Sequence, residues 1–207
     1  MTSKNKRSLG SALGLVLALT LGVAMMAPGP ALGGNALGHE KVRWDLIQLG
    51  GTGSTTTALP GGTDVGLDAV TGDTVEVTGS GIVRPDSGDV TGGGTFVHKH
   101  SDGSVFARGF YVVTDFVSWE QRAGTFPAPN DGVGHLSEAS AGVLVLDILA
   151  FADGGPAGGI PGVLTIHCHF PDTPQADEEG IELTATVGGT TFHFTQHGGV
   201  TLFHVFR

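Results

Sequence analysis

The sequence has one cysteine, Cys168, among its 207 residues. A single thiol cannot form an internal disulfide, so stability must come from a hydrophobic core, and the length suits one domain with such a core. An odd cysteine can pair between molecules, act as a nucleophile or fill space in the core. The strand pattern described below favours the last of these roles.

Basic residues are also scarce. Ten Lys and Arg stand against twenty Asp and Glu, for a net charge of −10. Three of the ten lie in the first seven positions, and without them seven remain against twenty, a net charge near −13. A polyanion without a basic patch is a poor partner for nucleic acid or anionic lipid. We therefore expect no nucleic-acid partner and interpret the acidic loop residues as aids to solubility.

The N-terminus has the organisation of a secretory signal peptide. A basic start, MTSKNKRSLG, precedes the apolar run SALGLVLALTLGVAMMA, and APGPALGG supplies small residues for cleavage. A transmembrane anchor is the alternative, because the run approaches spanning length. Pro28 and Pro30, directly after the run, favour cleavage. We predict a signal peptide over residues 1–33, a secreted (extracellular or cell-envelope) mature protein, and no stable membrane insertion after cleavage.

Sustained helical periodicity is absent after this segment, as are a G-x-S-x-G elbow, a P-loop, H-E-x-x-H and an EF-hand loop. Short runs of β-branched and aromatic residues are present instead, separated by many of the 36 glycines, which is typical of strands. The predicted strands are Trp44–Leu49, Thr74–Val83, Gly94–His100, Val105–Trp119, Gly142–Phe151, Gly162–Phe170, Ile181–Val187, Thr191–Gln196 and Val200–Phe206. Strands joined by turns such as Gly188-Gly189 predict an all-β fold, a single antiparallel barrel or sandwich of about eight or nine strands. Residues 34–66 are expected to hold one strand and a flexible Gly/Thr-rich segment, and residues 67–207 the all-β domain.

Alternation along the strands predicts where the histidines point. In VLTIHCHF, Cys168 shares the apolar face, while His167 and His169 share the other. His193 lies on the polar face of a later strand. If the two strands are neighbours, the three imidazoles come within reach of one zinc or copper ion. The alternative is that they are polar positions facing water, and no cofactor is predicted.

A second H-x-H pair, His98 and His100, lies in GGGTFVHKH. This stretch resembles the opening of the cupin metal motif, a glycine followed after five residues by H-x-H, and the resemblance implies a jelly-roll metal site. The glutamate expected next is replaced by Ser104 and Val105, and no asparagine after Asn130 can complete the second motif. His98 and His100 stay as further candidate metal ligands only.

Two aspartates lie in strands that are apolar on both faces, Asp115 in GFYVVTDFVSW and Asp147 in GVLVLDILAF. Alternation places Asp115 on the same face as Tyr111 and Trp119. A carboxylate there must be paired, hydrogen-bonded or kept protonated. We predict that Tyr111, Asp115, Trp119 and Asp147 line a ligand cavity, with Asp115 and Asp147 as catalytic candidates. Structural pairing with arginine or backbone amides is the alternative.

Three functions follow from these features. The first is a non-catalytic module that binds a small apolar ligand or a surface partner. The second is a barrel enzyme, of isomerase or cyclase type, that uses the buried aspartates on an apolar substrate. The third is a metal-binding protein that uses the histidine pairs. The sequence favours the first and leaves the ligand and the oligomeric state open.

Overall fold

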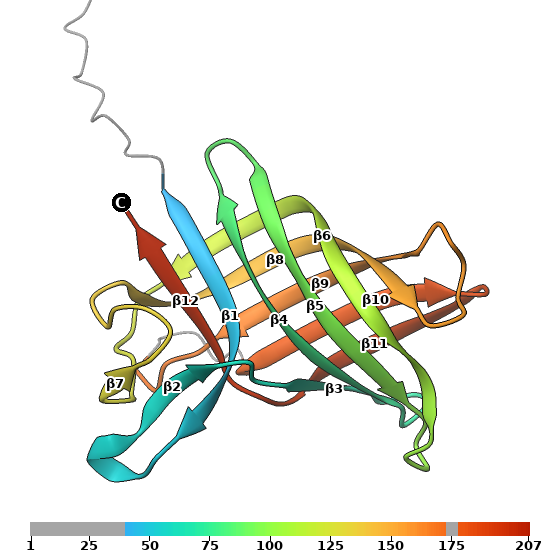
Figure 1. Cartoon of the computed structure of the whole chain (residues 1–207), viewed down its shortest axis with the longest axis horizontal. Helices are drawn as coiled ribbons and strands as arrows, with labels where there is room; N and C mark the ends of the chain where they lie inside the picture. Colours follow the sequence, from blue (N-terminus) through green and yellow to red (C-terminus); the bar gives the residue numbers. More distant parts are fainter. Residues whose placement is uncertain (1–39, 173–177) are drawn as a thin grey trace, which may run out of the picture. The chain divides into compact units, whose positions relative to one another are not determined.

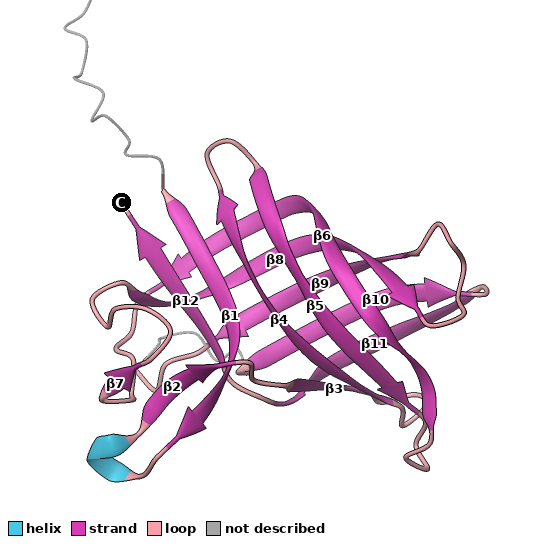
Figure 2. Cartoon of the chain, in the orientation of Figure 1, coloured by secondary structure: helices cyan, strands magenta, loops and turns pink. Residues whose placement is uncertain are grey.

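A computed structural model of the chain describes residues 40–172 and 178–207 (Figure 1). The predicted signal peptide lies outside these residues. The described part is all-β, with strands joined by loops and one 3-10 turn, η1 (Gly53–Thr55) (Figure 2). Within it no helix has the length and apolarity needed to cross a bilayer. Its strands form one 12-stranded sheet.

All nine predicted strands are present, with ends shifted by a few residues. The strands are β1 (Lys41–Gly50), β2 (Thr57–Pro60), β3 (Asp64–Asp68), β4 (Thr74–Arg84), β5 (Asp89–Lys99), β6 (Val105–Arg122), β7 (Asn130–Asp131), β8 (Ala139–Ala152), β9 (Ile160–Cys168), β10 (Gly180–Val187), β11 (Thr190–Gly198) and β12 (Thr201–Phe206). Gly188 and Gly189 form the predicted two-residue turn between β10 and β11, with φ values of 58° and 86°. Positive φ at both positions matches the twist of the flanking strands.

The structure differs from the sequence prediction between residues 50 and 66, where a flexible Gly/Thr-rich segment was expected. This region contains β2 and the first part of β3. The buried positions of β3 are Asp64, Gly66 and Asp68, so the strand has no apolar alternation to reveal it. Its neighbours β4 and β11 hold it in the sheet by antiparallel pairing.

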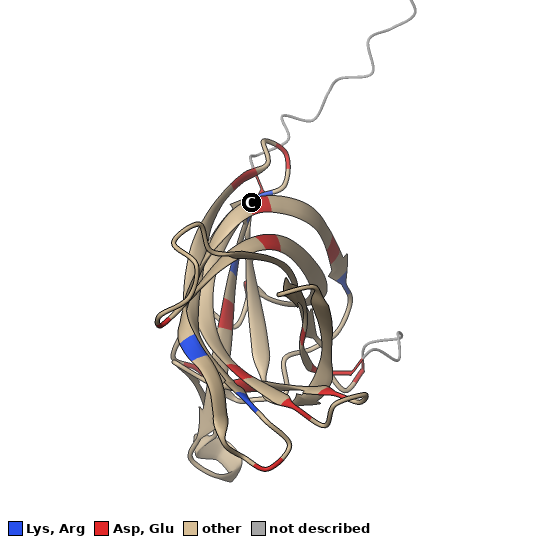
Figure 3. Cartoon of the chain, turned by 90° about the vertical axis from the view of Figure 1, so that its right-hand side faces the viewer, with Lys and Arg blue, Asp and Glu red and all other residues tan. Residues whose placement is uncertain are grey.

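The strand pairings form two closed circuits, which share β4, β5, β6 and β8. The eight-strand circuit runs β3, β4, β5, β6, β8, β9, β10, β11 and back to β3. The six-strand circuit runs β4, β5, β6, β8, β12, β1 and back to β4. Every pairing in both circuits is antiparallel. Figure 3 looks toward the eight-strand end and shows acidic residues scattered over strands and loops.

The core lies on the inward faces of these strands. On β9 and just beyond it, Leu164, Ile166, Cys168 and Phe170 are all buried, as alternation predicted. The Cys168 thiol lies 3.3 Å from the carbonyl oxygen of Thr201, and burial raises its pKa well above the usual value. A protonated, enclosed thiol is a core group and a poor nucleophile.

The six-strand end is filled by large side chains. The ring of Trp44 lies against the backbone of β4 and β5, where a Cβ added to Gly81 would come within 2.6 Å of the Trp44 ring nitrogen. At Gly92 the same addition would lie 2.9 Å from the ring. Phe203 is fully buried and meets Trp119 edge-on at 4.7 Å. The glycines therefore make room for an indole ring that closes this end.

Candidate ligand-binding site

The eight-strand end holds a cavity of about 260 Å³. Its walls come from β4, β5, β6, β8, β9, β10 and β11 and are almost entirely apolar. The lining residues are Val75, Val77, Phe96, His98, Phe106, Ala107, Tyr111, Ile148, Ala150, Ala152, Asp153, Gly154, Gly155, Pro156, Ile160, Leu164, Leu183, Ala185, Val187, Phe192 and Phe194. An engineered apolar cavity of about 150 Å³ binds benzene, so this one has room for a larger molecule.

Small side chains create this space. The inward positions of β8 pass from Leu144 and Leu146 at the filled end to Ala150 and Ala152 at the cavity. On β10 the cavity wall includes Ala185. Eight-stranded circuits have an interior just wide enough for side chains to fill, so alanine at facing positions leaves a void.

The β8–β9 loop contributes to the rim. Residues 153–156 line the cavity, in the Gly/Pro-rich segment that was expected to border an opening. Phe106, at the start of β6, is 48% exposed although it lines the same cavity. A residue that is both exposed and cavity-lining marks the mouth.

His98 is the polar group set into the apolar wall. It is 7% exposed, and the rings of Phe106, Phe192 and Phe194 meet it edge-on at 4.7 to 5.1 Å. Its Nε2 lies 3.0 Å from Oδ2 of Asp73. Burial lowers the pKa of His98, although the Asp73 carboxylate opposes the shift, so the ring is neutral at neutral pH.

Asp73 holds His98 in place and was not predicted from the sequence. Its Oδ1 accepts the backbone N–H of Ser101, and its Oδ2 also lies 3.3 Å from Nδ1 of His100. The residue is in the β3–β4 turn, and only the strand register brings that turn beside the β5–β6 loop. A turn aspartate carries no sequence signal for such a long-range partner.

Tyr111 is the one predicted ligand-binding residue that lines the cavity. Its hydroxyl donates a hydrogen bond to the carbonyl oxygen of Thr78 at 3.0 Å, and burial raises its pKa. A Cβ added at Gly79 would lie 2.1 Å from that hydroxyl, so glycine is needed there. Tyr111 separates the cavity from the filled end, with its polar atom already bonded.

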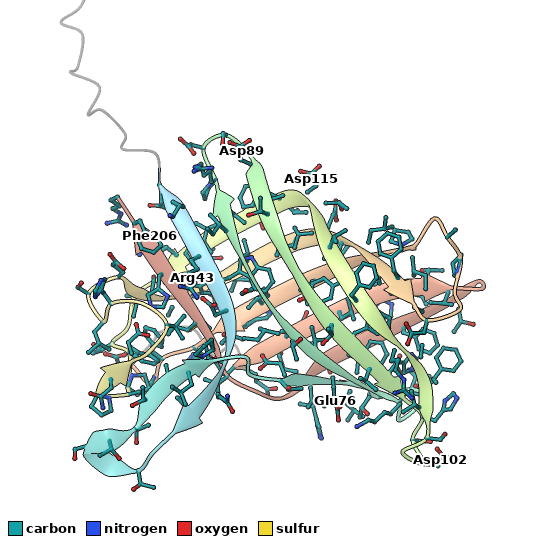
Figure 4. All side chains as sticks on the ribbon, viewed as in Figure 1. Arg43, Glu76, Asp89, Asp102, Asp115 and Phe206 are labelled. Carbon is teal, nitrogen blue, oxygen red and sulfur yellow. The ribbon has the colours of Figure 1, made fainter. Side chains whose placement is uncertain are left out.

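Asp115 does not share the face of Tyr111. Register shifts between Val113 and Asp115, and again between Phe116 and Ser118, interrupt the alternation of β6. Each β-bulge adds a residue and reverses the side-chain order, so Phe116 and Trp119 pack against the core while Asp115 is exposed on the outer side (Figure 4). The prediction that Asp115 is buried in an apolar strand is wrong for this reason.

Asp147 is directly opposite Asp115 in the β6–β8 pairing. It is half-buried and lines an outer surface depression beside Thr114 and Val163, separate from the cavity. Trp119 does not line the cavity either. The structure therefore brings Asp115 and Asp147 together, but on the outer face.

The three histidines proposed to share a metal ion do not meet. His193 pairs with Thr184 on β10, whereas His167 pairs with Gly180, four positions further along the same strand. This offset is roughly 13 Å, with two strand spacings added across the sheet. In the parts of the chain that the structure describes, no group of three or more His, Cys, Asp or Glu is placed to hold a metal ion.

Two carboxylates are buried beneath the β11–β12 connection. Asp64 is fully buried, with Oδ1 accepting the N–H of Val200 at 3.0 Å, and burial, reinforced by the charge of Glu179, raises its pKa to about 7. Burial likewise raises the pKa of Glu179 to about 7, although the backbone N–H groups of His169 and Thr201 oppose the shift. Neither carboxylate lines the cavity.

A third polar cluster lies under the 123–138 segment. His204 Nε2 is 2.7 Å from Oδ2 of Asp131, and both side chains are essentially inaccessible. Arg43 pairs with Asp45 at 2.7 Å and donates to the carbonyl oxygen of Val133. These bonds tie a long loop to β1 and β12, which is a structural role.

Neither a family model, nor a curated protein, nor a solved structure matches the chain. The cavity joins a defined volume, an apolar wall and one oriented polar ring, which is the usual composition of a small-molecule site.

Proposed function

We propose that the mature protein is a β-barrel that binds one small apolar molecule in its interior without converting it. The closed eight-strand circuit supports the barrel, and the apolar cavity of about 260 Å³ is the observation that carries the function. Burying an apolar ligand in such a wall is favourable at about 25 cal/mol per Å² of surface removed from water.

The cavity volume limits the ligand. Scaling from benzene in a cavity of about 150 Å³ gives roughly ten non-hydrogen atoms. Naphthalene has this size and no polar group, which makes it a suitable probe. At about −0.6 kcal/mol per atom, its dissociation constant is expected in the tens of micromolar.

Calorimetric titration of naphthalene into residues 34–207 tests the proposal. Ala150→Phe and Ala185→Phe place a ring inside the cavity from two different strands and are expected to abolish binding. Val163→Phe adds the same bulk on the outer face, where Val163 is 38% exposed, and is expected to bind like the wild type. Unchanged binding in both filled variants, with native circular dichroism, would contradict the proposal.

Secretion is part of the same proposal and is supported by the basic start, apolar run and small-residue segment of the N-terminus. Expression of the full chain in a secreting host, followed by the intact mass of the exported product, tests it. A product that begins near residue 34 agrees with the proposal, and a product that keeps the apolar run contradicts it.

The alternative enzyme and metal functions lose their support. Asp115 is open to water and Asp147 faces away from the cavity, so neither of the predicted catalytic aspartates stands beside a bound ligand, and the histidine and acidic side chains that line the cavity are His98 and Asp153. The register separates His193 from His167. A surface partner keeps one supporting observation, the outer stack of Phe110 on Phe151 at 5.1 Å, with Phe110 53% exposed. If this stack is a contact surface, Phe110→Ser should change the association of the protein measured by light scattering and should leave naphthalene binding the same.

A further inference from the structure

The wall of the cavity contains one ring that can hydrogen-bond inward. The Tyr111 hydroxyl is already bonded to Thr78, and Asp153 lies on the exposed rim. His98 is different, because Asp73 bonds only one of its two ring nitrogens. A buried polar ring among three phenylalanines is costly unless its hydrogen-bonding groups are satisfied.

The partners of Asp73 fix the tautomer of His98. Asp73 accepts the N–H of Ser101 through Oδ1, and its Oδ2 faces Nε2 of His98. An ionised carboxylate only accepts, so Nε2 carries the proton and donates it. In a neutral imidazole the other nitrogen, Nδ1, is then an acceptor with a free lone pair.

Nδ1 of His98 has no hydrogen-bond partner among the described residues. It is also not one of the fully enclosed nitrogens that lack a partner, so it keeps accessible surface although the residue as a whole is 7% exposed. The ring lines the cavity. A molecule in the cavity, whether water or a ligand that displaces it, can therefore supply the donor.

We propose that the ligand is a compact apolar molecule of roughly ten non-hydrogen atoms bearing one hydroxyl group, which donates a hydrogen bond to Nδ1 of His98. The inference rests on the proposed ligand-binding function and adds the chemical class of the ligand. The apolar wall binds the carbon skeleton, and Asp73 acts as a positioning residue that presents the acceptor. Alcohols and phenols fit this description, whereas ethers of the same size lack the donor.

Three matched probes test the class: naphthalene, 1-naphthol and 1-methoxynaphthalene, titrated into residues 34–207 at pH 7.5. The wild type is expected to bind 1-naphthol roughly two- to tenfold more tightly than the methyl ether, the range of one net hydrogen bond. His98→Phe keeps a ring in the wall but removes the acceptor, so the preference should vanish while naphthalene affinity stays within about threefold.

Asp73→Asn tests whether Asp73 sets the tautomer of His98, while the His98 ring stays in the cavity wall. An asparagine amide can donate to Nε2 and move the proton to Nδ1, which then donates, so the preference should shift from 1-naphthol toward the ether. His193→Phe makes the same change as His98→Phe at an exposed position on the outer face and should keep the wild-type preference. His98→Leu replaces His98→Phe if the latter does not fold.

The outcomes distinguish the proposed ligand-binding function from the hydroxyl inference. If none of the three probes binds the wild type, the proposed function fails and the inference falls with it. If naphthalene binds but 1-naphthol is not preferred, or if the preference survives in His98→Phe, the function stands and the hydroxyl inference is overturned. A preference that is lost in His98→Phe and kept in His193→Phe supports both.

Discussion

Replacing Asp64 with asparagine is expected to stabilise the protein increasingly as the pH rises from 5 to 9. Asp64 is fully buried and its pKa is raised from 3.8 to about 7, mainly by burial. The folded state therefore holds the proton more tightly than the unfolded state. The stability contributed by this group is complete below pH 3.8 and is lost as the pH rises through 7. Asparagine is neutral at every pH and removes the loss.

The size of the stability change follows from the shift in the pKa of Asp64. A difference of about 3 pKa units corresponds to about 4 kcal/mol in total, at 1.36 kcal/mol per unit. About 2 kcal/mol of this falls between pH 5 and pH 7, and the rest of the change below pH 9, about 0.5 kcal/mol, falls just above the folded-state pKa, where the curve levels off. The free energy of unfolding of Asp64→Asn, minus that of the wild type, should therefore grow by about 3 kcal/mol from pH 5 to pH 9.

Urea denaturation of both proteins at pH 5, 6, 7, 8 and 9 measures this difference. Asp102→Asn is the matched control, because Asp102 lies at the tip of the β5–β6 loop (Figure 4) and the Ser104 hydroxyl and amide lower its pKa. Its contribution changes only in more acidic solution, so the control should show no trend over the same range. A difference between Asp64→Asn and wild type that does not vary with pH would refute the assignment of a buried, protonated carboxyl group.

Three further substitutions are expected to change stability in urea denaturation. Leu164→Ala should cost about 3 kcal/mol, since Leu164 is fully buried, and should raise the affinity for ligands larger than naphthalene in calorimetry because it enlarges the cavity. His204→Leu should cost about 1 to 3 kcal/mol because it removes the hydrogen-bond partner of the enclosed Asp131 Oδ2, while the N–H groups of Val133 and Gly134 still bond Oδ1, and a variant of near wild-type stability would contradict this. Asp147→Asn should gain about 0.5 kcal/mol by removing a like charge opposite Asp115, and the gain should shrink in 1 M salt.

The strands could be predicted because each carries a local signal. β9 alternates apolar and polar residues, so its inward face and the burial of Cys168 follow from period-two spacing alone. The Gly188-Gly189 turn is equally local. β3 could not be found in this way, because its inward positions are two aspartates and a glycine that depend on β4 and β11.

The placement of the site residues could not be predicted from side-chain alternation alone. Two bulges in β6 reverse the side-chain order, and no residue type within the strand marks them, so alternation alone places Asp115 on the wrong face. Asp73 and His98 are 25 residues apart and meet only through the register of β3, β4 and β5. His98 itself was identified, but as a metal candidate, because an H-x-H pair is visible in sequence and its aspartate partner is not.

The position of the cavity follows from how β4 and β5 change along their length. Where they belong to the six-strand circuit, Gly81 and Gly92 face each other and leave the space that Trp44 occupies. Where they belong to the eight-strand circuit, the inward positions are side chains such as Val77 and Phe96, with no indole ring between them. The circumference grows with strand number, so the wider end needs more side-chain volume to fill it. The chain instead places alanines on β8 and β10 at that end. One pair of strands therefore supports a closed core at one end and an open, apolar volume at the other.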